Sequence, residues 1–334
     1  MRIALLGPIA WRTPPRHYGP WELVTGLLAD GLAERGFDVT LFATLDSVTR
    51  AQLDGVCPRP YEEHADLDGR VWEALHVAHA LSRSADFDIV HNHLDWLPLA
   101  FSELSRAPMV TTIHGFSSSQ ILPAYKRAKS AFVSISEADR SPEIDYVATV
   151  YHGVDAGLLP FSAAGGEELV CFGRIHPDKG THEAVAIARG AGRRLVLCGP
   201  VQDERYFSEQ VAPHVDGERV RYLGSVGPDE RAEVLGHAAC LLHPIAFEEP
   251  FGLSVVEAML CGTPVVAYSR GSMPEIIEDG VTGVLADGVP AATEAVERAA
   301  GLDRATCRNA AEARFGVRQM IDSYLQVYAD VLRA

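Results

Sequence analysis

The chain has 334 residues, of which 47% are hydrophobic and 22% are charged, and its formal net charge is −16. This length favours two domains of roughly 150 residues each, and the composition is that of a folded protein. The acidic balance excludes a general attraction to nucleic acid or to an anionic membrane, so an anionic ligand needs a locally basic pocket.

The hydrophobic runs are too short to direct the protein to a membrane. The first, residues 1–7, lacks the length and the flanking charge of a signal peptide. No later run approaches the ~20 residues of a membrane-spanning helix. We therefore expect a cytoplasmic protein without stable membrane insertion. The six cysteines include no C-x-x-C pair, so we expect reduced thiols packed in the core.

Short apolar runs rich in Val, Ile and Leu alternate with helical periodicity along nearly the whole chain. This alternation predicts an α/β protein with parallel sheets covered by helices. The expected strands are 2–7, 38–43, 87–93, 109–114, 131–136 and 148–151 in the first half, and 169–173, 194–199, 220–224, 240–243, 264–268 and 283–286 in the second.

Two apolar stripes mark the clearest helices. Trp21, Val24, Leu28 and Leu32 lie on one face of a helix that ends before the glycine at position 36. A second stripe, formed by residues 253, 256 and 260, ends before a glycine and a proline at 262 and 264. Each predicted helix follows a predicted strand, which is the βα order of a parallel sheet.

One interruption, rich in Pro, Ser and Gly, lies between residues 155 and 168 and predicts the domain boundary. We expect Rossmann-like domains at 1–155 and 156–316. A C-terminal amphipathic helix is expected at 317–334, and its return to the first domain is left open. Open α/β sheets bind ligands at the carboxyl ends of their strands, so we expect the two domains to face a cleft.

The segment CFGRIHPDKGTHEAV places two cations at a βα turn. Arg174 follows a predicted strand, and Lys179 precedes a helix for which Thr181 is the expected N-cap. Two converging cations suit a diphosphate, since they neutralise the charge that grows as it leaves. The alternative is a pair of solvated surface cations.

The segment EEPFGLSVVEAMLCGTPVV places Glu249 in a loop and Glu257 inside the following helix. Between them, the N–H groups of Phe251, Gly252 and Leu253 open the helix and can bind phosphate oxygens at its positive end. The two carboxylates can then face the two ends of a bound sugar nucleotide. The alternative is a pair of ordinary acids near a helix start.

The second motif, E-x-F-G-x-x-x-x-E-A-M from Glu249 to Met259, resembles the retaining GT-B glycosyltransferases of family 4 (glycosyl transferases group 1). Gly173-Arg174 and Lys179-Gly180 match the same family upstream. Four other segments resemble the family in its order and extend the likeness to nearly the full chain: DIVHNH at 88–93, VTTIHG at 110–115, HGVD at 152–155 and PEIIEDGVTG at 274–283.

The resemblance implies a GT-B fold in which the C-terminal domain binds the nucleotide sugar and the N-terminal domain binds the acceptor. It implies that Arg174 and Lys179 hold the donor diphosphate and that Glu257 binds the ribose hydroxyls. Glu249 would accept hydroxyls of the transferred sugar, and His114 would lie beside that sugar. These roles make Glu249, His114, Arg174 and Lys179 the expected catalytic set.

Two weaker expectations also follow from the resemblance. The backbone of Val226 would contact the base, and Gly19 would approach the phosphates. Tyr18 and Pro20 flank Gly19 where the family usually has consecutive glycines, and Pro20 has no N–H to donate. His152 replaces the asparagine common in the family, without removing any residue to which we assign a role.

Three side chains raise the alternative of a metal site. His91, His93 and Asp95 form H-x-H-x-D, and imidazoles at alternate strand positions can share one ion. A dinuclear hydrolase needs a further histidine where Trp96 stands, and the resemblance assigns this run to a strand end. We therefore expect no metal ligands and no metal requirement.

The expected function is transfer of a hexose, with retention, from a nucleoside diphosphate sugar such as uridine diphosphate glucose to an acceptor hydroxyl. No G-x-G-x-x-G after the first strand, no P-loop motif and no G-x-S-x-G motif is present, which weakens dehydrogenase, kinase and hydrolase interpretations. A GT-B sugar-nucleotide epimerase, a glycan phosphorylase and a non-catalytic sugar-nucleotide-binding protein are the alternatives. No nucleic-acid partner is expected, and the oligomeric state is left open.

Overall fold

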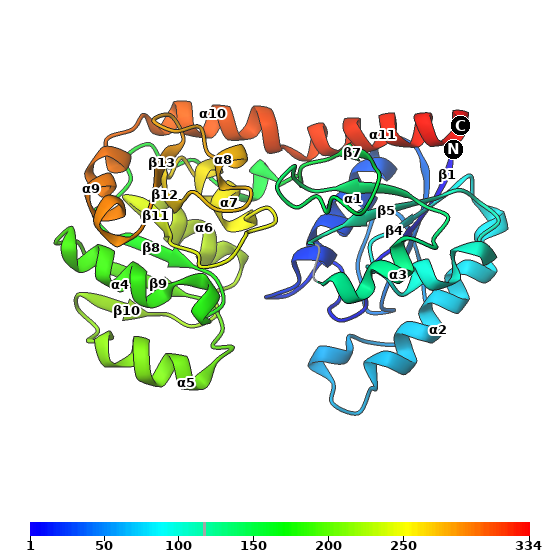
Figure 1. Cartoon of the computed structure of the whole chain (residues 1–334), viewed down its shortest axis with the longest axis horizontal. Coiled ribbons are helices and arrows are strands. Elements are labelled where there is room, and N and C mark those ends of the chain that lie inside the picture. Colours follow the sequence, from blue (N-terminus) through cyan, green and yellow to red (C-terminus); the bar gives the residue numbers. More distant parts are fainter. Residues whose placement is uncertain (116–117) are drawn as a thin grey trace. The chain divides into compact units, whose positions relative to one another are not determined.

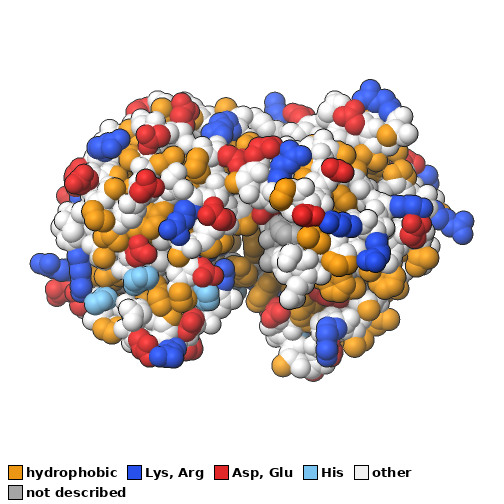
Figure 2. Space-filling view, viewed as in Figure 1, with side chains coloured by type: hydrophobic (Ala, Val, Ile, Leu, Met, Phe, Trp, Pro, Cys, Tyr) orange, Lys and Arg blue, Asp and Glu red, His pale blue; other side chains and the backbone are white. Residues whose placement is uncertain are grey.

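The computed structural model describes residues 1–115 and 118–334, which divide into two compact units (Figure 1). The first unit comprises Met1–Gly153 and Val317–Ala334, and the second comprises Val154–Gly316. The chain therefore leaves the first unit once and returns to it with its last helix. Figure 2 shows acidic and basic side chains interspersed over the viewed face of each unit.

The first unit contains a seven-stranded sheet in the order β3-β2-β1-β4-β5-β6-β7, in which each paired strand runs parallel to its neighbour. Its helices include α11, which packs against α1. The strands are β1 (Arg2–Leu6), β2 (Asp38–Phe42), β3 (Gln52–Asp54), β4 (Ile89–Asn92), β5 (Met109–Ile113), β6 (Ala131–Ser134) and β7 (Tyr146–Thr149), and the helices are α1 (Pro20–Glu34), α2 (Gly69–Ser82), α3 (Leu122–Tyr125) and α11 (Val317–Arg333).

The second unit contains a six-stranded parallel sheet in the order β10-β9-β8-β11-β12-β13. The strands are β8 (Leu169–Phe172), β9 (Leu195–Cys198), β10 (Val220–Tyr222), β11 (Cys240–His243), β12 (Val265–Tyr268) and β13 (Gly283–Ala286). The helices are α4 (Thr181–Gly190), α5 (Glu204–Tyr206), α6 (Pro228–His237), α7 (Leu253–Leu260), α8 (Met273–Ile276), α9 (Val289–Ala300) and α10 (Arg304–Phe315).

Both sheets reverse their strand order at one point. In the first sheet, β1 lies between β2 and β4, and in the second, β8 lies between β9 and β11. Such a reversal leaves a crevice outside the carboxyl ends of the two central strands, where ligands of open α/β sheets bind. The loops that follow β1 and β4, and those that follow β8 and β11, are therefore the first places to look for functional side chains.

Three details differ from the sequence-based expectations. β3 was not predicted, because it has only three residues and none of them is buried. β7 lies at Tyr146–Thr149, two residues earlier than expected, and the Cα register is irregular where it pairs with β6. Thr181 is the first residue of α4 and not its N-cap, because Gly180 precedes the helix in a left-handed conformation with φ 63°.

Candidate functional site

The central feature of the second unit is a buried ion pair at the switch point of its sheet. Lys179, in the turn between β8 and α4, places its Nζ 2.5 Å from Oε2 of Glu249, which lies in the loop between β11 and α7. His243, the last residue of β11, places its Nε2 3.4 Å from the same oxygen. The Lys179 ammonium also lies 4.6 Å from the centre of the Phe247 ring. The predicted phosphate-binding lysine therefore contacts the predicted sugar-binding carboxylate directly.

This environment fixes Glu249 as an anion. Burial alone would raise its pKa, but the hydrogen bond from His243 and the charge of Lys179 prevail and lower the pKa to about 2. Burial also lowers the pKa of His243, against the opposing effect of Glu249. The cluster thus holds a carboxylate whose charge is balanced by one ammonium.

Arg174 lies directly after β8 and differs from Lys179 in its partner. Its guanidinium donates to the neutral Oε1 of Gln202, and the side chain is only partly buried. No ion pair found among the described residues includes Arg174. The arginine therefore keeps its full charge available for an anion, whereas the charge of Lys179 is already balanced by Glu249.

The amino terminus of α7 faces the same switch point, because its loop follows β11. Gly252 precedes the helix with φ 85°, a conformation that glycine adopts without strain. A Cβ at this position would lie 2.7 Å from Cε of Met273. The Ser272 hydroxyl donates to the carbonyl of Phe251 at 3.0 Å, which fixes the loop. The N–H groups of Leu253 and the next residue have no acceptor within the helix and suit an anion.

Glu257 lies in the middle of α7 and is held by a residue that sequence analysis missed. Its Oε1 accepts from Nη1 of Arg231, in α6, at 2.9 Å. Burial raises the pKa of Glu257, and the charge of Arg231 opposes this shift. The guanidinium also lies 5.1 Å from the ring centre of Phe172, at the end of β8. Val226, in the loop between β10 and α6, is 3% exposed.

In the first unit, the loop after β1 is organised around a buried carboxyl. Glu22, in the first turn of α1, accepts the N–H of Trp11 on its Oε1 at 3.1 Å. A Cβ on Gly19, whose φ is 146°, would lie 3.0 Å from the other oxygen of Glu22. Burial raises the pKa of Glu22 to about 7. Gly19 is thus needed for close packing of its own loop, and the role of Glu22 was not predicted.

His114 follows β5 and belongs to a chain of buried histidines. Its Nε2 lies 2.9 Å from Nδ1 of His93, and its own Nδ1 lies 3.3 Å from Nε2 of His152. The chain continues from His93 to His91. Trp21 stacks on the His114 ring at a centroid distance of 5.3 Å. Both ring nitrogens of the predicted sugar-side histidine are therefore engaged by other histidines.

The two histidines of the H-x-H-x-D segment are members of this chain of histidines, and its aspartate is not. His91 and His93 bond to each other and to their neighbours, while Asp95 accepts from the Tyr125 hydroxyl. Among the described residues, no group of three or more His, Cys, Asp or Glu side chains is placed to hold a metal ion. All six cysteines are buried free thiols.

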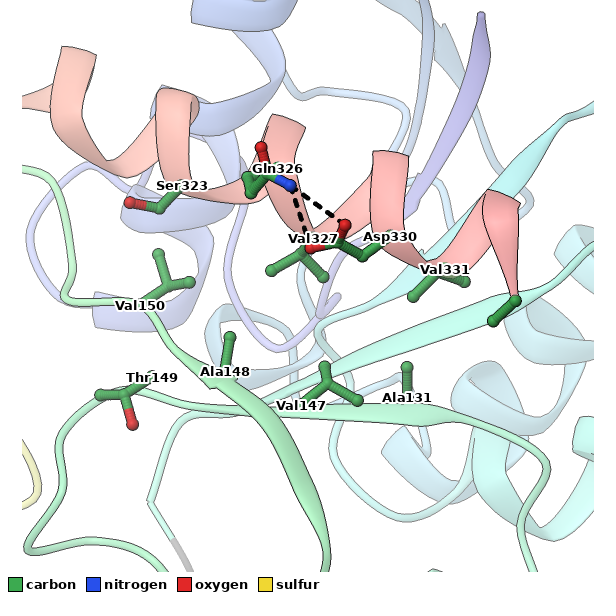
Figure 3. A pocket seen from close by; sticks show the side chains of 11 residues that line it. Ala131, Val147, Ala148, Thr149, Val150, Ser323, Gln326, Val327, Asp330 and Val331 are labelled. Atoms are coloured by element: carbon green, nitrogen blue, oxygen red, sulfur yellow. Dashed lines mark hydrogen bonds between the residues drawn. The ribbon is translucent and has the colours of Figure 1, made fainter.

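A groove of about 690 Å³ in the first unit lies apart from the predicted residues (Figure 3). It lies between α11 and the strands β6 and β7, and valine and alanine side chains form most of its lining. At its rim, Gln326 donates to both carboxylate oxygens of Asp330 at 3.0 Å. None of the predicted site residues lines this groove.

Two family models match the chain in succession. The model described as Glycosyltransferase Family 4 matches residues 22–156, and the model described as Glycosyl transferases group 1 matches residues 162–312. The chain belongs to the group 1 glycosyltransferases. This glycosyltransferase is 27% identical to the glycogen synthase of Mycobacterium tuberculosis (strain ATCC 25618 / H37Rv), and the alignment covers 85% of this chain and 82% of that relative.

Solved structures share the fold. The crystal structure of AviGT4, a glycosyltransferase involved in avilamycin A biosynthesis, has 26% sequence identity and a TM-score of 0.77, and the match covers 100% of this chain and 98% of AviGT4. The structure of Anabaena HepE in complex with UDP and glucose has 20% identity and a TM-score of 0.76, with coverage of 99% and 100%. The expected GT-B fold of this glycosyltransferase is confirmed. No helix within residues 1–115 and 118–334 combines the length and the apolar character needed to cross a bilayer.

Proposed function

We propose that this glycosyltransferase transfers a hexose from a nucleoside diphosphate sugar to an acceptor hydroxyl, with retention at the anomeric carbon. Uridine diphosphate glucose is the first donor to test. HepE, which has the same fold, was crystallised with UDP and glucose, and the glycogen synthase of M. tuberculosis is a relative over most of this chain.

The observation that carries the proposal is the anion site at the switch point of the second sheet. Arg174 follows β8, α7 begins after β11, and these two strands are neighbours. Arg174 supplies a charge that pairs with no carboxylate in the described part of the chain, and α7 supplies N–H groups at the positive end of its dipole. A diphosphate leaving group gains charge as the glycosidic bond breaks, so these groups stabilise the transition state more than the ground state.

Glu249 and Lys179 form the sugar side of the proposed site. Lys179 and His243 both contact Oε2 of Glu249. Its Oε1 has no hydrogen bond or ion pair with any of the described residues. Oε1 is therefore the oxygen proposed to accept a hydroxyl of the transferred sugar. Lys179 can approach a diphosphate oxygen while it keeps Glu249 in place, because an ammonium has three donors.

The low pKa of Glu249 bears on how retention is achieved. A carboxylate whose pKa is lowered to about 2 is a weak nucleophile, because the ammonium and the imidazole at Oε2 stabilise its negative charge. We therefore propose that the acceptor attacks from the side of the departing diphosphate and passes its proton to a phosphate oxygen. Arg174, Lys179 and the α7 terminus provide the positive charge, and transfer is expected to survive removal of divalent cations with a chelator.

The decisive experiment is calorimetric titration with UDP. Replacing Arg174 with alanine should weaken UDP binding about 10-fold to 100-fold, because a hydrogen bond to a charged group contributes about 1.5–3 kcal/mol. Arg205→Ala is the matched control, since Arg205 lies in the same unit, has an 84% exposed side chain and pairs with Glu209, four residues later. Equal UDP affinity in the wild type and Arg174→Ala would overturn the assignment.

A second measurement separates transfer from the alternatives. The wild type is incubated with the donor alone and then with candidate acceptors, and the anomeric protons of donor and product are followed by NMR. Retention of the donor configuration in a new glycoside supports the proposal. Conversion of the donor to another sugar nucleotide without acceptor would identify an epimerase, and an unchanged donor with every acceptor would identify a binding protein.

A further inference from the structure

The first unit contains a continuous line of hydrogen bonds that ends at two tyrosines of α11. Nδ1 of His91 lies 2.6 Å from the Tyr328 hydroxyl, and Nε2 of His91 lies 2.8 Å from the Thr112 hydroxyl, which in turn lies 2.8 Å from the Tyr324 hydroxyl. From His91 the line continues through His93 to His114 and His152. The two tyrosines are fully buried, and the four histidines are buried to within a few per cent.

All four imidazoles are neutral, because burial away from compensating carboxylates disfavours the charged form. The pKa of His91, His93 and His114 lies well below the usual value, and that of His152 is lowered to about 3. A neutral imidazole has one N–H and one bare nitrogen. Each contact between two rings must therefore join an N–H of one to the bare nitrogen of the other, so the state of one ring fixes the state of the next.

The Tyr328 hydroxyl gives the line its direction. A separation of 2.6 Å suits an O–H donor, whereas N–H donors lie mostly at about 2.9–3.0 Å from oxygen. The Tyr328 hydroxyl therefore donates to Nδ1 of His91, and the proton of His91 is on Nε2. That N–H donates to the Thr112 hydroxyl, whose oxygen can also accept from Tyr324.

The next three rings follow from this assignment. Nδ1 of His91 is bare and faces Nε2 of His93 at 3.3 Å, so Nε2 of His93 carries a proton and shares the lone pair of Nδ1 with the shorter bond from Tyr328, because two bare nitrogens would repel each other. Nδ1 of His93 is then bare and accepts from Nε2 of His114 at 2.9 Å. His114 is left with a bare Nδ1, which accepts from Nε2 of His152 at 3.3 Å.

We propose that the Tyr328 hydroxyl, acting through His91 and His93, holds His114 in the tautomer with the proton on Nε2, so that His114 accepts a hydrogen bond from the sugar at Nδ1. The inference rests on the proposed function, in which His114 lies beside the transferred sugar. The contact with His152 is longer than the contact with His93, and it is the one that a sugar hydroxyl can replace. Tyr328, His91, His93 and His152 are positioning residues, and the group that His114 recognises is a hydroxyl.

The tautomer can be measured without substrate. Two-bond ¹H–¹⁵N correlation spectra of protein labelled with ¹⁵N-histidine distinguish a bare ring nitrogen from a protonated one, and His→Gln variants assign the signals. The wild type is expected to show a bare Nδ1 and a protonated Nε2 at His114. A protonated Nδ1 at His114, or fast averaging between the tautomers, would overturn the proposal.

Two tyrosine variants test the direction of the line. Tyr328→Phe removes the donor, so Thr112 becomes free to donate to His91 and the His114 signals should shift toward the tautomer with the proton on Nδ1. Tyr324→Phe is the matched control, because it removes a hydroxyl one turn away on the same helix. Within the described residues, the Tyr324 hydroxyl bonds only to Thr112. Unchanged His114 signals in Tyr328→Phe would contradict the proposal.

Kinetics connect the tautomer to transfer. Tyr328→Phe should lower kcat about tenfold, the rate equivalent of about 1.4 kcal/mol, with little change in the KM of the donor. Tyr324→Phe should stay close to the wild type. If the wild type transfers no sugar, the proposed function fails while the tautomer assignment stands. If it transfers sugar and the variants have equal kcat, the link between Tyr328 and His114 fails instead.

Discussion

The two units of this glycosyltransferase bury their functional polar side chains by opposite means. The second unit pairs charges, as in Lys179 with Glu249 and Arg231 with Glu257. The first unit favours the neutral form of its buried groups: the pKa values of its buried histidines are lowered, and the pKa of Glu22 is raised to about 7. Burial of an unpaired ion is costly, and a protein avoids that cost either by pairing the ion with an opposite charge or by keeping the group neutral.

Two sheets of similar topology can therefore respond differently to pH. A paired carboxylate with a lowered pKa, such as Glu249, loses its stabilising effect only below its unfolded pKa, near pH 4.5 for glutamate. A buried neutral histidine loses it below pH 6.5, where the unfolded chain takes up a proton that the folded chain does not bind. The first unit should therefore be the more sensitive to acid.

The largest expected effect is acid unfolding of the first unit. Each buried histidine with a lowered pKa reduces the free energy of unfolding by about 1.4 kcal/mol per pH unit between pH 6.5 and its folded pKa. Glu22 acts in the opposite sense, because the folded state binds its proton first as the pH falls from 7 to 4.5. Five such histidines lie in the first unit: His76, His91, His93, His114 and His152.

Tryptophan fluorescence separates the two units in this experiment. The four tryptophans, Trp11, Trp21, Trp72 and Trp96, all belong to the first unit. As the pH is lowered from 7 to 4, the emission should change at a higher pH than the last part of the helical circular dichroism, to which the helices of both units contribute. A single transition, seen at the same pH by both probes, would show that the two units do not differ in this way.

The sequence was sufficient to predict the fold because both sheets consist of buried apolar runs. Strands such as β9 and β12 have four buried residues each, and continuous runs of this kind indicate parallel strands covered on both faces. β3 lacked this signal, because it is a short edge strand with no buried residue. Thr181 was predicted as an N-cap from its residue type, but the left-handed turn at Gly180 already starts the helix.

The candidate site was predictable where its residues lie close together in the sequence. Arg174, Lys179, Glu249 and Glu257 occur in two compact motifs, and the structure brings Lys179 and Glu249 into contact. The partners of these residues were missed, because Arg231 and His243 lie on other elements and belong to no motif. The same reason applies to the histidine chain. Its members come from two strands, three loops and the last helix, so only the folded chain shows that they touch.

The second-largest effect should come from breaking an ion pair of the second unit. Arg231→Met leaves Glu257, which is 6% exposed, without its partner. Removal of one member of a buried pair costs about 3–5 kcal/mol. Thermal unfolding followed by far-ultraviolet circular dichroism is the measurement, because the second unit has no tryptophan.

The control for this variant is the double substitution Arg231→Met, Glu257→Met, which removes both charges and should recover most of the lost stability. The single variant should also recover as the pH falls, since burial raises the pKa of Glu257 and protonation then removes the unpaired charge. A double variant as unstable as the single one would mean that packing of the arginine, and not its charge, is what matters.

A smaller effect of opposite sign is expected from Glu22→Gln. The amide keeps an acceptor for the N–H of Trp11 and cannot ionise. At pH 8 the wild type buries a carboxylate whose pKa is raised from 4.5 to about 7, so the variant should be more stable by about 3 kcal/mol. The advantage should grow between pH 4.5 and pH 7 and then level off. Chemical denaturation followed by tryptophan emission tests this, and a variant less stable than the wild type at pH 8 would contradict it.

The smallest effect concerns a single ring, that of His152, and its contribution to the pH dependence of stability. His152→Gln removes one of the buried neutral histidines, while its amide nitrogen takes the place of the ring Nε2 and can still donate to Nδ1 of His114. Stability at pH 7 should stay within about 1 kcal/mol of the wild type, as for the loss of one ordinary hydrogen bond. Below pH 6.5 the variant should lose stability less steeply, by about 1.4 kcal/mol per pH unit. Identical pH profiles of tryptophan emission for the two proteins would mean that His152 is not the neutral buried base on which this account of the first unit depends. A slope that falls by this amount, with the His114 tautomer unchanged in the ¹⁵N spectrum, would instead separate the two roles of the ring, since a glutamine can replace its hydrogen bond but cannot take up its proton.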